Sequence, residues 1–415
     1  MKNLSKIALR NLRRYTRRSV LTISLIALGV MFVLVFVAVT GSFKQLMITQ
    51  ITDSYLGSVQ IHRRGYVAAI ETLPVNLNLT AAQATAIEAA LAGMPEIHAS
   101  SQRIKFGGLF SNFVETTNIR LNGVDPAAEF ATCPDMAARL MQGDQEVRTL
   151  QRGTILVPEL LAQGFGTTVG DTVVVVATNK DGSVNGKTLV VSGILASATG
   201  PGGRDGYVHI DDAMEILRLP EREVSEIAVR VHSLAQVDRV ADRLRGVLAG
   251  LMPGTGRGGV EVHTWAQLSP FANIARMIDV MIFFIRLMLI AVVLISILNV
   301  MLMAVYERVR EIGTIAAIGT LPHRILSLFL VEGLFLGVVG AAVGVLGGVG
   351  IIVVLHRVQL PITFGQGGKY LLAPTVAPLE VLIASLMVIV IAILASVQPA
   401  YKASRMEPIE ALRHV

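Results

Sequence analysis

Residues 287–306 read LMLIAVVLISILNVMLMAVY, and residues 307–324, which follow directly, read ERVREIGTIAAIGTLPHR. The first stretch has no charged side chain and has about the 20 residues that a helix needs to cross roughly 30 Å of hydrocarbon. The second stretch is too short for a domain. Most of its charged residues lie in its first five positions, and apolar residues follow them. It predicts a short docking helix through which a soluble partner pushes on the membrane helices.

The composition extends this interpretation to the whole chain. Hydrophobic residues make up 53% of it and charged residues 16%, with a mean hydropathy of +0.61, well above the values typical of soluble domains. Four stretches of spanning length lack charges: Ser19–Phe43, Leu287–Tyr306, Gly333–Leu355 and Val381–Tyr401. We therefore predict an integral membrane protein with four transmembrane helices and both termini on one side.

The basic residues near the span ends predict the orientation, because lysine and arginine resist translocation. They concentrate before the first span, in the 307–324 insert and after the fourth span. The N-terminus, the insert and the tail are therefore expected on the cytoplasmic side. The net charge of +6 indicates seating on an anionic membrane surface, and it does not indicate nucleic-acid binding.

These observations divide the chain into nine expected segments. They are a cytoplasmic amphipathic helix (1–18), a first transmembrane helix (19–43), a periplasmic α+β domain (44–275), a stalk and second transmembrane helix (276–306), a cytoplasmic coupling helix (307–324), a third transmembrane helix (325–355), an outer loop (356–378), a fourth transmembrane helix (379–401) and a cytoplasmic tail (402–415).

The large segment between the first two spans is of ordinary polarity and long enough for a packed domain. Runs of β-branched residues between Gly, Pro and Asp predict strands at 58–62, 97–106, 116–124, 172–177, 187–194, 206–210 and 226–232. Helices are expected at 80–92, 158–163, 211–217 and 234–251, the first capped by Thr80. The single cysteine, Cys133, excludes an intramolecular disulfide.

A long helix is expected from about Trp265 to Tyr306. It outruns the bilayer, so its first third is predicted to project outward as a stalk. Neither Gly nor Pro occurs between Phe271 and Val305, which favours a stiff rod that carries motion across the membrane.

The sequence offers little for catalysis or cofactor binding. The segment Gly182–Thr188 resembles a phosphate-binding loop, but it has three residues between its glycines where the motif needs four, and it lies between two β-rich runs. We interpret it as a hairpin turn. The eight histidines lack metal-ligand spacing and are expected at the surface or as caps. We therefore expect no catalytic residue, metal site or bound cofactor in this chain.

Three charges near the spans need partners. Asp279 lies three residues after Arg276 and seven before Arg286, and it is expected to pair with either arginine. Glu332, at the start of the third span, is interpreted as an interfacial acid paired with a basic residue, with a functional role as the alternative.

The third span contains glycines at three- and four-residue spacing, which lets another helix approach closely. Packing within one subunit and a dimer contact are both open. The glycines are Gly333, Gly337, Gly340, Gly344 and Gly348. Pro399 is expected to bend or end the fourth span.

The insert resembles the signature of the FtsX-like permease domain, which MacB, LolC, LolE and FtsX share. The resemblance rests on Glu307-Arg308-Val309-Arg310-Glu311-Ile312-Gly313 followed by Ala317-Ile318-Gly319. Further matching pieces, in order along the chain, are 153–156 with 169–173, 332–334, and 399–405 with 408–413. In length and in the segment 56–66 the chain looks more like the lipoprotein-releasing permeases than like MacB.

This resemblance implies a permease of the bacterial inner membrane that pairs with a second copy or a paralogue. It implies two separate ABC ATPase subunits, which bind ATP and Mg and dock on the insert as a coupling helix. The residues matched to docking are Glu307, Arg308, Arg310, Glu311, Ile312, Gly313, Ala317, Ile318 and Gly319. Lipid, and a periplasmic carrier, adaptor or hydrolase, are further implied partners.

Two functions remain open from the sequence. One is ATP-driven extrusion of a lipoprotein or another hydrophobic cargo. The alternative is an FtsX-like transmitter that regulates a periplasmic cell-wall hydrolase without moving cargo.

Overall fold

The structure is a computed structural model that describes residues 10, 14, 16–143, 150–197, 205–251, 259–363 and 369–407. The predicted N-terminal helix and the end of the predicted tail lie largely outside these residues. The chain divides into two compact units. The membrane unit comprises residues 1–44, 275–360 and 371–415, and the domain unit comprises residues 45–274 with 361–370.

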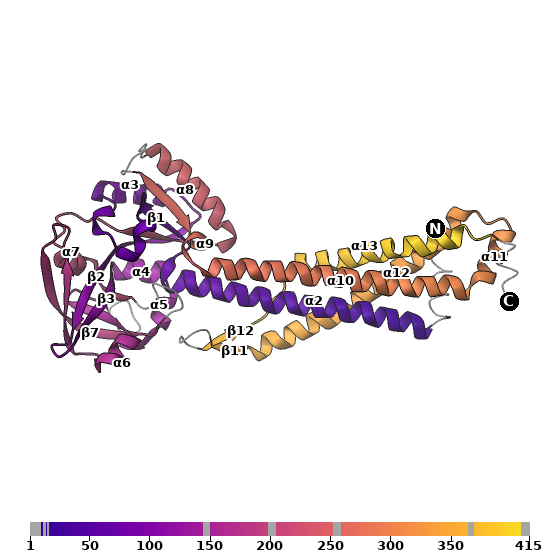
Figure 1. Ribbon diagram of the computed structural model, residues 1–415, viewed down its shortest axis with the longest axis horizontal. Coiled ribbons are helices and arrows are strands. Elements are labelled where there is room, and N and C mark those ends of the chain that lie inside the picture. The colour runs from indigo at the N-terminus through magenta and orange to yellow at the C-terminus, as the bar shows by residue number, and fades with distance from the viewer. Residues whose placement is uncertain are drawn as a thin grey trace. The chain divides into compact units, whose positions relative to one another are not determined.

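The membrane unit is built from four long helices that run alongside one another (Figure 1). They are α2 (Thr16–Ile51), of which the part up to Lys44 belongs to this unit, α10 (Phe271–Glu307), α12 (Pro322–Val358) and α13 (Pro378–Ser404). All four are long and apolar enough to cross a membrane. The short helix α11 (Val309–Ala317) lies between α10 and α12. The prediction of four spans with a large domain between the first and second is confirmed.

The glycines of α12 pack against two neighbouring helices within the same unit. A methyl group at Gly337 would lie 2.6 Å from the Cβ of Ala392 in α13. One at Gly344 would lie 2.7 Å from the carbonyl oxygen of Ala27 in α2. Gly333 likewise faces α13, and Gly340 and Gly348 face α2. Because only glycine leaves room for such approach, the structure uses this series for packing inside one chain.

The fourth helix continues past Pro399 to Ser404, so of the two expectations for this proline, that it bends or ends the helix, the second is wrong. Proline removes one hydrogen bond from the ladder, but Pro399 and Ala400 are buried and α13 extends to Ser404. Close packing of α13 against Gly333 and Gly337 of α12 offsets the missing bond. Tertiary contacts here outweigh the local preference.

The domain unit contains a ten-stranded sheet of order β10-β1-β9-β2-β3-β8-β5-β7-β4, in which β6 pairs with both β2 and β7. The strands β2, β3, β8, β5, β7 and β6 therefore form a closed ring. The bounds are β1 Val59–Arg63, β2 Ile97–Ser111, β3 Thr116–Val124, β4 Leu140–Gln142, β5 Thr154–Pro158, β6 Thr172–Thr178, β7 Val184–Leu195, β8 Gly206–His209, β9 Glu226–Val231 and β10 Val260–Thr264. Strands β11 (Leu360–Thr363) and β12 (Lys369–Leu372) pair separately.

Helices cover this sheet and bury its apolar residues. They are α3 Ala81–Ala92, α4 Pro126–Thr132, α5 Asp135–Ala138, α6 Glu159–Phe165, α7 Ile210–Ile216, α8 Val237–Leu251 and α9 Trp265–Leu268, with a π-helix η1 Thr52–Leu56 and 3₁₀ turns η2 Val67–Thr72, η3 Val75–Leu77 and η6 Leu234–Gln236. The main core contains Ile87 of α3, Ile104 of β2 and Leu244 of α8, all fully buried. The α+β class is thereby confirmed.

Two local sequence patterns predicted the structure correctly. Thr80 accepts a hydrogen bond from the Gln83 amide and completes a capping box. Residues 182–188 lie in the β6–β7 hairpin, where the Asn179 amide donates to the Ser183 carbonyl over 2.7 Å and Gly182 has φ +84°. The hairpin interpretation is confirmed. Strands β4 and β5 and helices α4 and α5 were not predicted, and strands β11 and β12 lie in the segment expected as an outer loop.

The long second helix is not continuous from Trp265, which corrects the expected rod. Helix α9 ends at Leu268, Ser269 is extended (φ −107°, ψ 130°), and α10 begins only at Phe271. Pro270 has no amide hydrogen to continue the ladder, so the break is local chemistry that the sequence contained. From Phe271 to Glu307 the helix is unbroken, as expected.

The glycine packing predicts unequal effects of one methyl group at two positions of α12. We expect Gly344→Ala to lower the free energy of unfolding by about 1–3 kcal/mol through overpacking, because the Ala27 carbonyl is backbone and cannot turn away. At Gly350 a methyl group meets no atom within 4 Å, and Gly350→Ala should be neutral or stabilising by up to about 1 kcal/mol. Unfolding of the two variants in detergent, followed by circular dichroism, tests this. Equal stability would contradict the packing.

Candidate functional site

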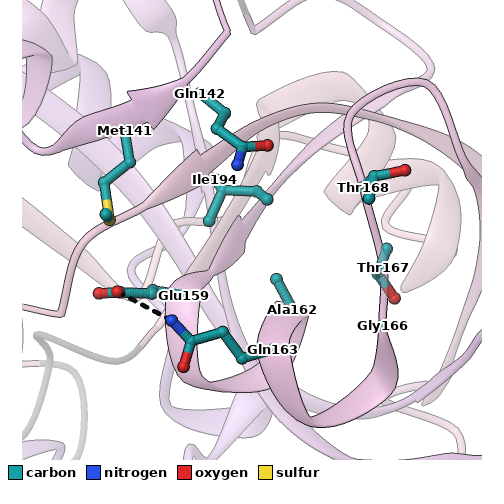
Figure 2. Close-up of a pocket in the computed structure, with 9 residues that line it drawn as sticks. All are labelled: Met141, Gln142, Glu159, Ala162, Gln163, Gly166, Thr167, Thr168 and Ile194. Atoms are coloured by element: carbon teal, nitrogen blue, oxygen red, sulfur yellow. Dashed lines mark hydrogen bonds between the residues drawn. The ribbon is translucent and has the colours of Figure 1, made fainter.

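Two hollows in the domain unit are lined mainly by uncharged side chains. One, of about 260 Å³, lies beside α6, and Figure 2 shows its lining. Among the described residues that line it, Glu159 alone is charged, and its carboxylate accepts a hydrogen bond from Gln163 of the same helix over 3.1 Å. The second, of about 600 Å³, lies over Gly107 and Gly108 of β2 and contains Arg120.

Metal ligation finds no support in the described segments, where no three His, Cys, Asp or Glu side chains lie close enough to hold an ion. His209 caps α7, as one of the expected roles. His62, however, is fully buried between Tyr66 and His263, so a surface or capping role for it is wrong. The remaining candidate site from the sequence is the segment that joins α10 to α12 through α11.

This segment folds into a compact turn–helix–turn for local reasons. Helix α10 ends at Glu307 and α11 begins at Val309. Gly319, with φ +95°, ends the next turn in a conformation that favours glycine. Pro322 then opens α12 at its first position, where its missing amide hydrogen has no cost.

A buried ion pair lies beneath α11. The Arg308 Nη1 is 3.1 Å from Glu332 Oε1, and these residues are 8% and 4% exposed. The Arg308 Nε also donates to Glu311 Oε2 over 3.0 Å. Burial lowers the pKa of Arg308, but Glu332 and Glu311 raise it above its ordinary value, so the guanidinium stays charged. The interpretation of Glu332 as an acid paired with a basic residue is confirmed, and its partner is Arg308.

Two further arginines tie this segment to the start of α2. Arg18 Nη1 lies 3.1 Å from Glu307 Oε2, and Arg18 also donates to the Val300 carbonyl. Arg14 Nη1 lies 3.2 Å from Glu311 Oε1. The half-exposed pairs contribute little energy singly. Together with the buried pair they connect α2, α10, α11 and α12.

The predicted docking residues divide between two faces of the segment. Arg308, Ile312 and Gly313 are buried, so they support α11 from within and do not offer surface to a partner. Glu311 is half-buried. The exposed members are Glu307, Arg310, Ala317, Ile318 and Gly319.

The exposed face contains more residues than the sequence indicated. Thr314 lies one turn after Arg310 and is exposed, and Ile318, one turn further, is 80% exposed. Ile315 and Leu321 are exposed large apolar residues beside them. The helical spacing of 310, 314 and 318 was the signal that would have found Thr314. Ile315, Ile318 and Leu321 thus place three exposed apolar side chains at this end of the segment.

The outer charges of α10 have partners on other helices. Lys44 Nζ lies 2.6 Å from Asp279 Oδ1, and Arg286 Nη2 lies 3.0 Å from Glu380 Oε2. The expected pairing of Asp279 with Arg286 is wrong. The two side chains are two helical turns apart, and each instead contacts a residue of another helix, Asp279 contacting Lys44 and Arg286 contacting Glu380.

The domain unit contains a second cluster of buried charges, which no sequence motif indicated. Arg103 of β2 is 1% exposed and donates through Nε and Nη2 to Glu129 over 2.9 and 2.7 Å. Its Nη1 donates to Glu226 Oε1 over 3.0 Å and to the Tyr55 carbonyl over 2.7 Å. Lys105 Nζ lies 3.0 Å from Glu226 Oε2. Two cations thus balance two carboxylates.

Comparison with known proteins places both units in described families. Residues 19–247 match the MacB-like periplasmic core domain, and residues 283–408 match the FtsX-like permease C-terminal region.

Two curated proteins and one solved structure have the following similarity to this chain. The macrolide export ATP-binding/permease protein MacB of Bdellovibrio bacteriovorus is 26% identical over 96% of this chain, which spans 59% of that protein's length. The lipoprotein-releasing system transmembrane protein LolC of Neisseria meningitidis is 24% identical, with 98% of each chain covered. The periplasmic region of MacB from Actinobacillus actinomycetemcomitans superposes with a TM-score of 0.36 at 13% identity, over 54% of this chain and 94% of that chain.

The buried pair under α11 predicts a strong effect of a single neutral substitution. Glu332→Gln removes the buried carboxylate partner of Arg308 and leaves only the half-buried Glu311 beside it, and we expect the unfolding free energy to fall by about 3–5 kcal/mol. Glu380→Gln removes the carboxylate of the more exposed pair with Arg286, and the expected loss is below about 1 kcal/mol. Denaturation of both variants in detergent provides the measurement. Similar losses would show that burial of the Arg308–Glu332 pair does not matter.

The domain cluster predicts a dependence on pH. Burial raises the pKa of Glu226, but Lys105, His62 and Arg103 outweigh it and hold that pKa well below its usual range. A carboxyl with a lowered pKa stabilises the fold above its unfolded pKa of about 4.3, and this contribution is lost as the pH falls towards the folded value.

We therefore expect Glu226→Gln to lower the unfolding free energy at neutral pH by about 3–5 kcal/mol. The unfolding free energy of this variant should also fall less than that of the wild type between roughly pH 5 and pH 3. Hydrogen exchange of the slowest β2 and β9 amides in the full chain measures both effects. Glu88→Gln, at an exposed position of α3, is the control and should change neither.

Proposed function

Because this chain belongs to the family of ABC transporter permeases that join a MacB-like periplasmic core domain to an FtsX-like permease region, we propose that it couples ATP hydrolysis by separate subunits to movement of its large domain. Its cargo is a lipoprotein or another hydrophobic molecule that leaves the inner membrane on the outer side. ATP and Mg bind to the partner ATPase subunits, two of which serve a pair of permease chains.

The exposed face of α11 is the observation that carries this proposal. Arg310, Thr314 and Ile318 form one stripe, and the 80% exposure of Ile318 suits an apolar anchor in a groove of a partner. The opposite face is held by Arg308 and Glu332. A partner that pushes on this helix therefore pushes on α12 directly, and through Arg14 and Arg18 on α2 as well.

Orientation supports the same assignment. The insert and both termini are cytoplasmic in our proposal, because the basic residues gather at these ends of the spans. The domain unit then lies in the periplasm, in agreement with its match to the MacB-like periplasmic core domain. Extrusion is preferred over regulation of a hydrolase, since the relatives include a macrolide export protein and a lipoprotein-releasing protein.

A charge placed in the exposed stripe tests the docking. We expect Ile318→Asp to weaken binding of the ATPase subunit at least tenfold, which corresponds to about 1.4 kcal/mol, because an apolar anchor is replaced by a carboxylate that must be desolvated. Co-purification and titration with the ATPase that accompanies the wild-type chain measure the change. Val114→Asp, at an 86% exposed valine of the β2–β3 turn, is the control. Unchanged binding in Ile318→Asp would refute docking on α11.

A further inference from the structure

The end of α2 is held in the domain unit in an unusual way. The helix runs unbroken to Ile51 and passes into the π-helix η1, Thr52–Leu56. The last carbonyl groups of a helix have no partner within the helix and need donors from elsewhere. Within the domain unit, side chains from several separate elements supply them.

Each donor comes from a different part of the domain. Arg103 of β2 donates to the Tyr55 carbonyl over 2.7 Å, and Arg139, which follows α5, donates to the Ser54 carbonyl over 3.1 Å. The thiol of Cys133, which follows α4, faces the Thr52 carbonyl at 3.6 Å. Burial raises the pKa of Cys133 to about 12, so the thiol keeps the proton that it donates.

A fourth contact fixes the remaining polar residue of η1. Asp53 Oδ2 accepts from Arg230 Nη2 of β9 over 3.0 Å. We call Arg103, Cys133, Arg139 and Arg230 the socket. Arg103 is itself held by the carboxylates of Glu129 and Glu226. Displacement of η1 therefore breaks several buried polar contacts at once, each costly to leave unmade.

The return connection from the domain is built differently. Between α9 and α10 the chain passes through extended Ser269 and through Pro270, where the helical ladder stops. Ser269 is buried and accepts hydrogen bonds from the amides of Phe271 and Ala272 over 3.3 and 3.2 Å, so these bonds at the break are local ones, and hinges form at a few such element-terminal residues. Residues 45–274 of the domain unit thus have one continuous helical connection to the membrane unit, which the socket holds, and one interrupted connection.

We propose that the socket makes α2 the driving connection, so that movement of the first span passes into the domain, whereas Ser269–Pro270 acts as the hinge for the second span. Arg103 and Arg139 are then positioning residues for the coupled movement. This proposal deepens the proposed function and rests on it. It also reverses the role of the second span, whose stiffness in the sequence suggested that it carries the motion.

Arginine suits this task for a physical reason. Its planar guanidinium has five donors in a fixed fork, so Arg103 can hold Glu129, Glu226 and the Tyr55 carbonyl together. Lysine retains the charge but loses the fork geometry. Arg103→Lys is therefore the substitution that loosens η1 while it retains a cation for the two carboxylates.

Matched insertions provide the main experiment. Three glycines are inserted between Lys44 and Gln45, where α2 passes from one unit to the other, or, as the control, between Ser269 and Pro270. Fluorophores are attached to cysteines introduced by Phe113→Cys and Arg357→Cys, both at exposed positions. The natural Cys133 is buried and stays unlabelled. The distance between the dyes is measured on single complexes in nanodiscs, with and without ATP, in the presence of the ATPase subunit.

We expect the ATP-dependent distance change to be lost with the insertion at 44/45 and retained with the insertion at 269/270. Arg103→Lys should reduce the change, while Arg243→Lys, at an exposed arginine of α8, should not. The opposite pattern, or equal effects of the two insertions, overturns the proposal. If Arg103→Lys fails to fold, the two insertions decide alone.

Failure of the proposed function is recognised separately. ATPase binding and basal hydrolysis are measured on the same samples, and neither insertion lies in the docking segment. A wild-type chain that binds no ATPase refutes the proposed function. A wild-type chain that binds ATPase and responds to ATP, with equal responses in both insertion variants, refutes only the role of the socket.

Discussion

The ion pair between Arg308 and Glu332 is the interaction on which the membrane unit depends. Both residues are buried at a point where two long apolar helices meet a short charged one. Neither charge is tolerable there alone, so α11 is held in one orientation against α12. That orientation puts Arg310, Thr314 and Ile318 outside. The exposed stripe is thus a consequence of the buried pair.

The same principle recurs in the domain unit on a larger scale. Arg103 contacts two buried carboxylates and a helix-terminal carbonyl, and it is itself 1% exposed. Buried charge is expensive and directional, so both clusters fix the position of a helix end more firmly than apolar packing alone. In each unit a buried arginine determines how a helix end is held.

Much of the architecture was predictable from local patterns. Uncharged runs indicated four spans because hydrocarbon excludes charge, and Thr80 marked a helix start through its capping box. The short helical segment between α10 and α12 was recognisable from its charged motif. Strands β4 and β5 and helices α4 and α5 were missed, because short elements depend on neighbours more than on their own residues. Arg103, Glu129 and Glu226 are far apart in sequence and have no spacing rule that joins them.

The sequence by itself determined the membrane class, the four spans, the α+β domain and the location of the short helical segment between the second and third spans, because hydropathy and charge act within a few turns of the chain. Only the tertiary structure decided which residues of that segment face outward. It also decided that the glycines of α12 serve α2 and α13, and that Asp279 pairs with Lys44. These outcomes depend on contacts between residues that are far apart in the sequence, and the local periodicity of the sequence contains no information about such contacts.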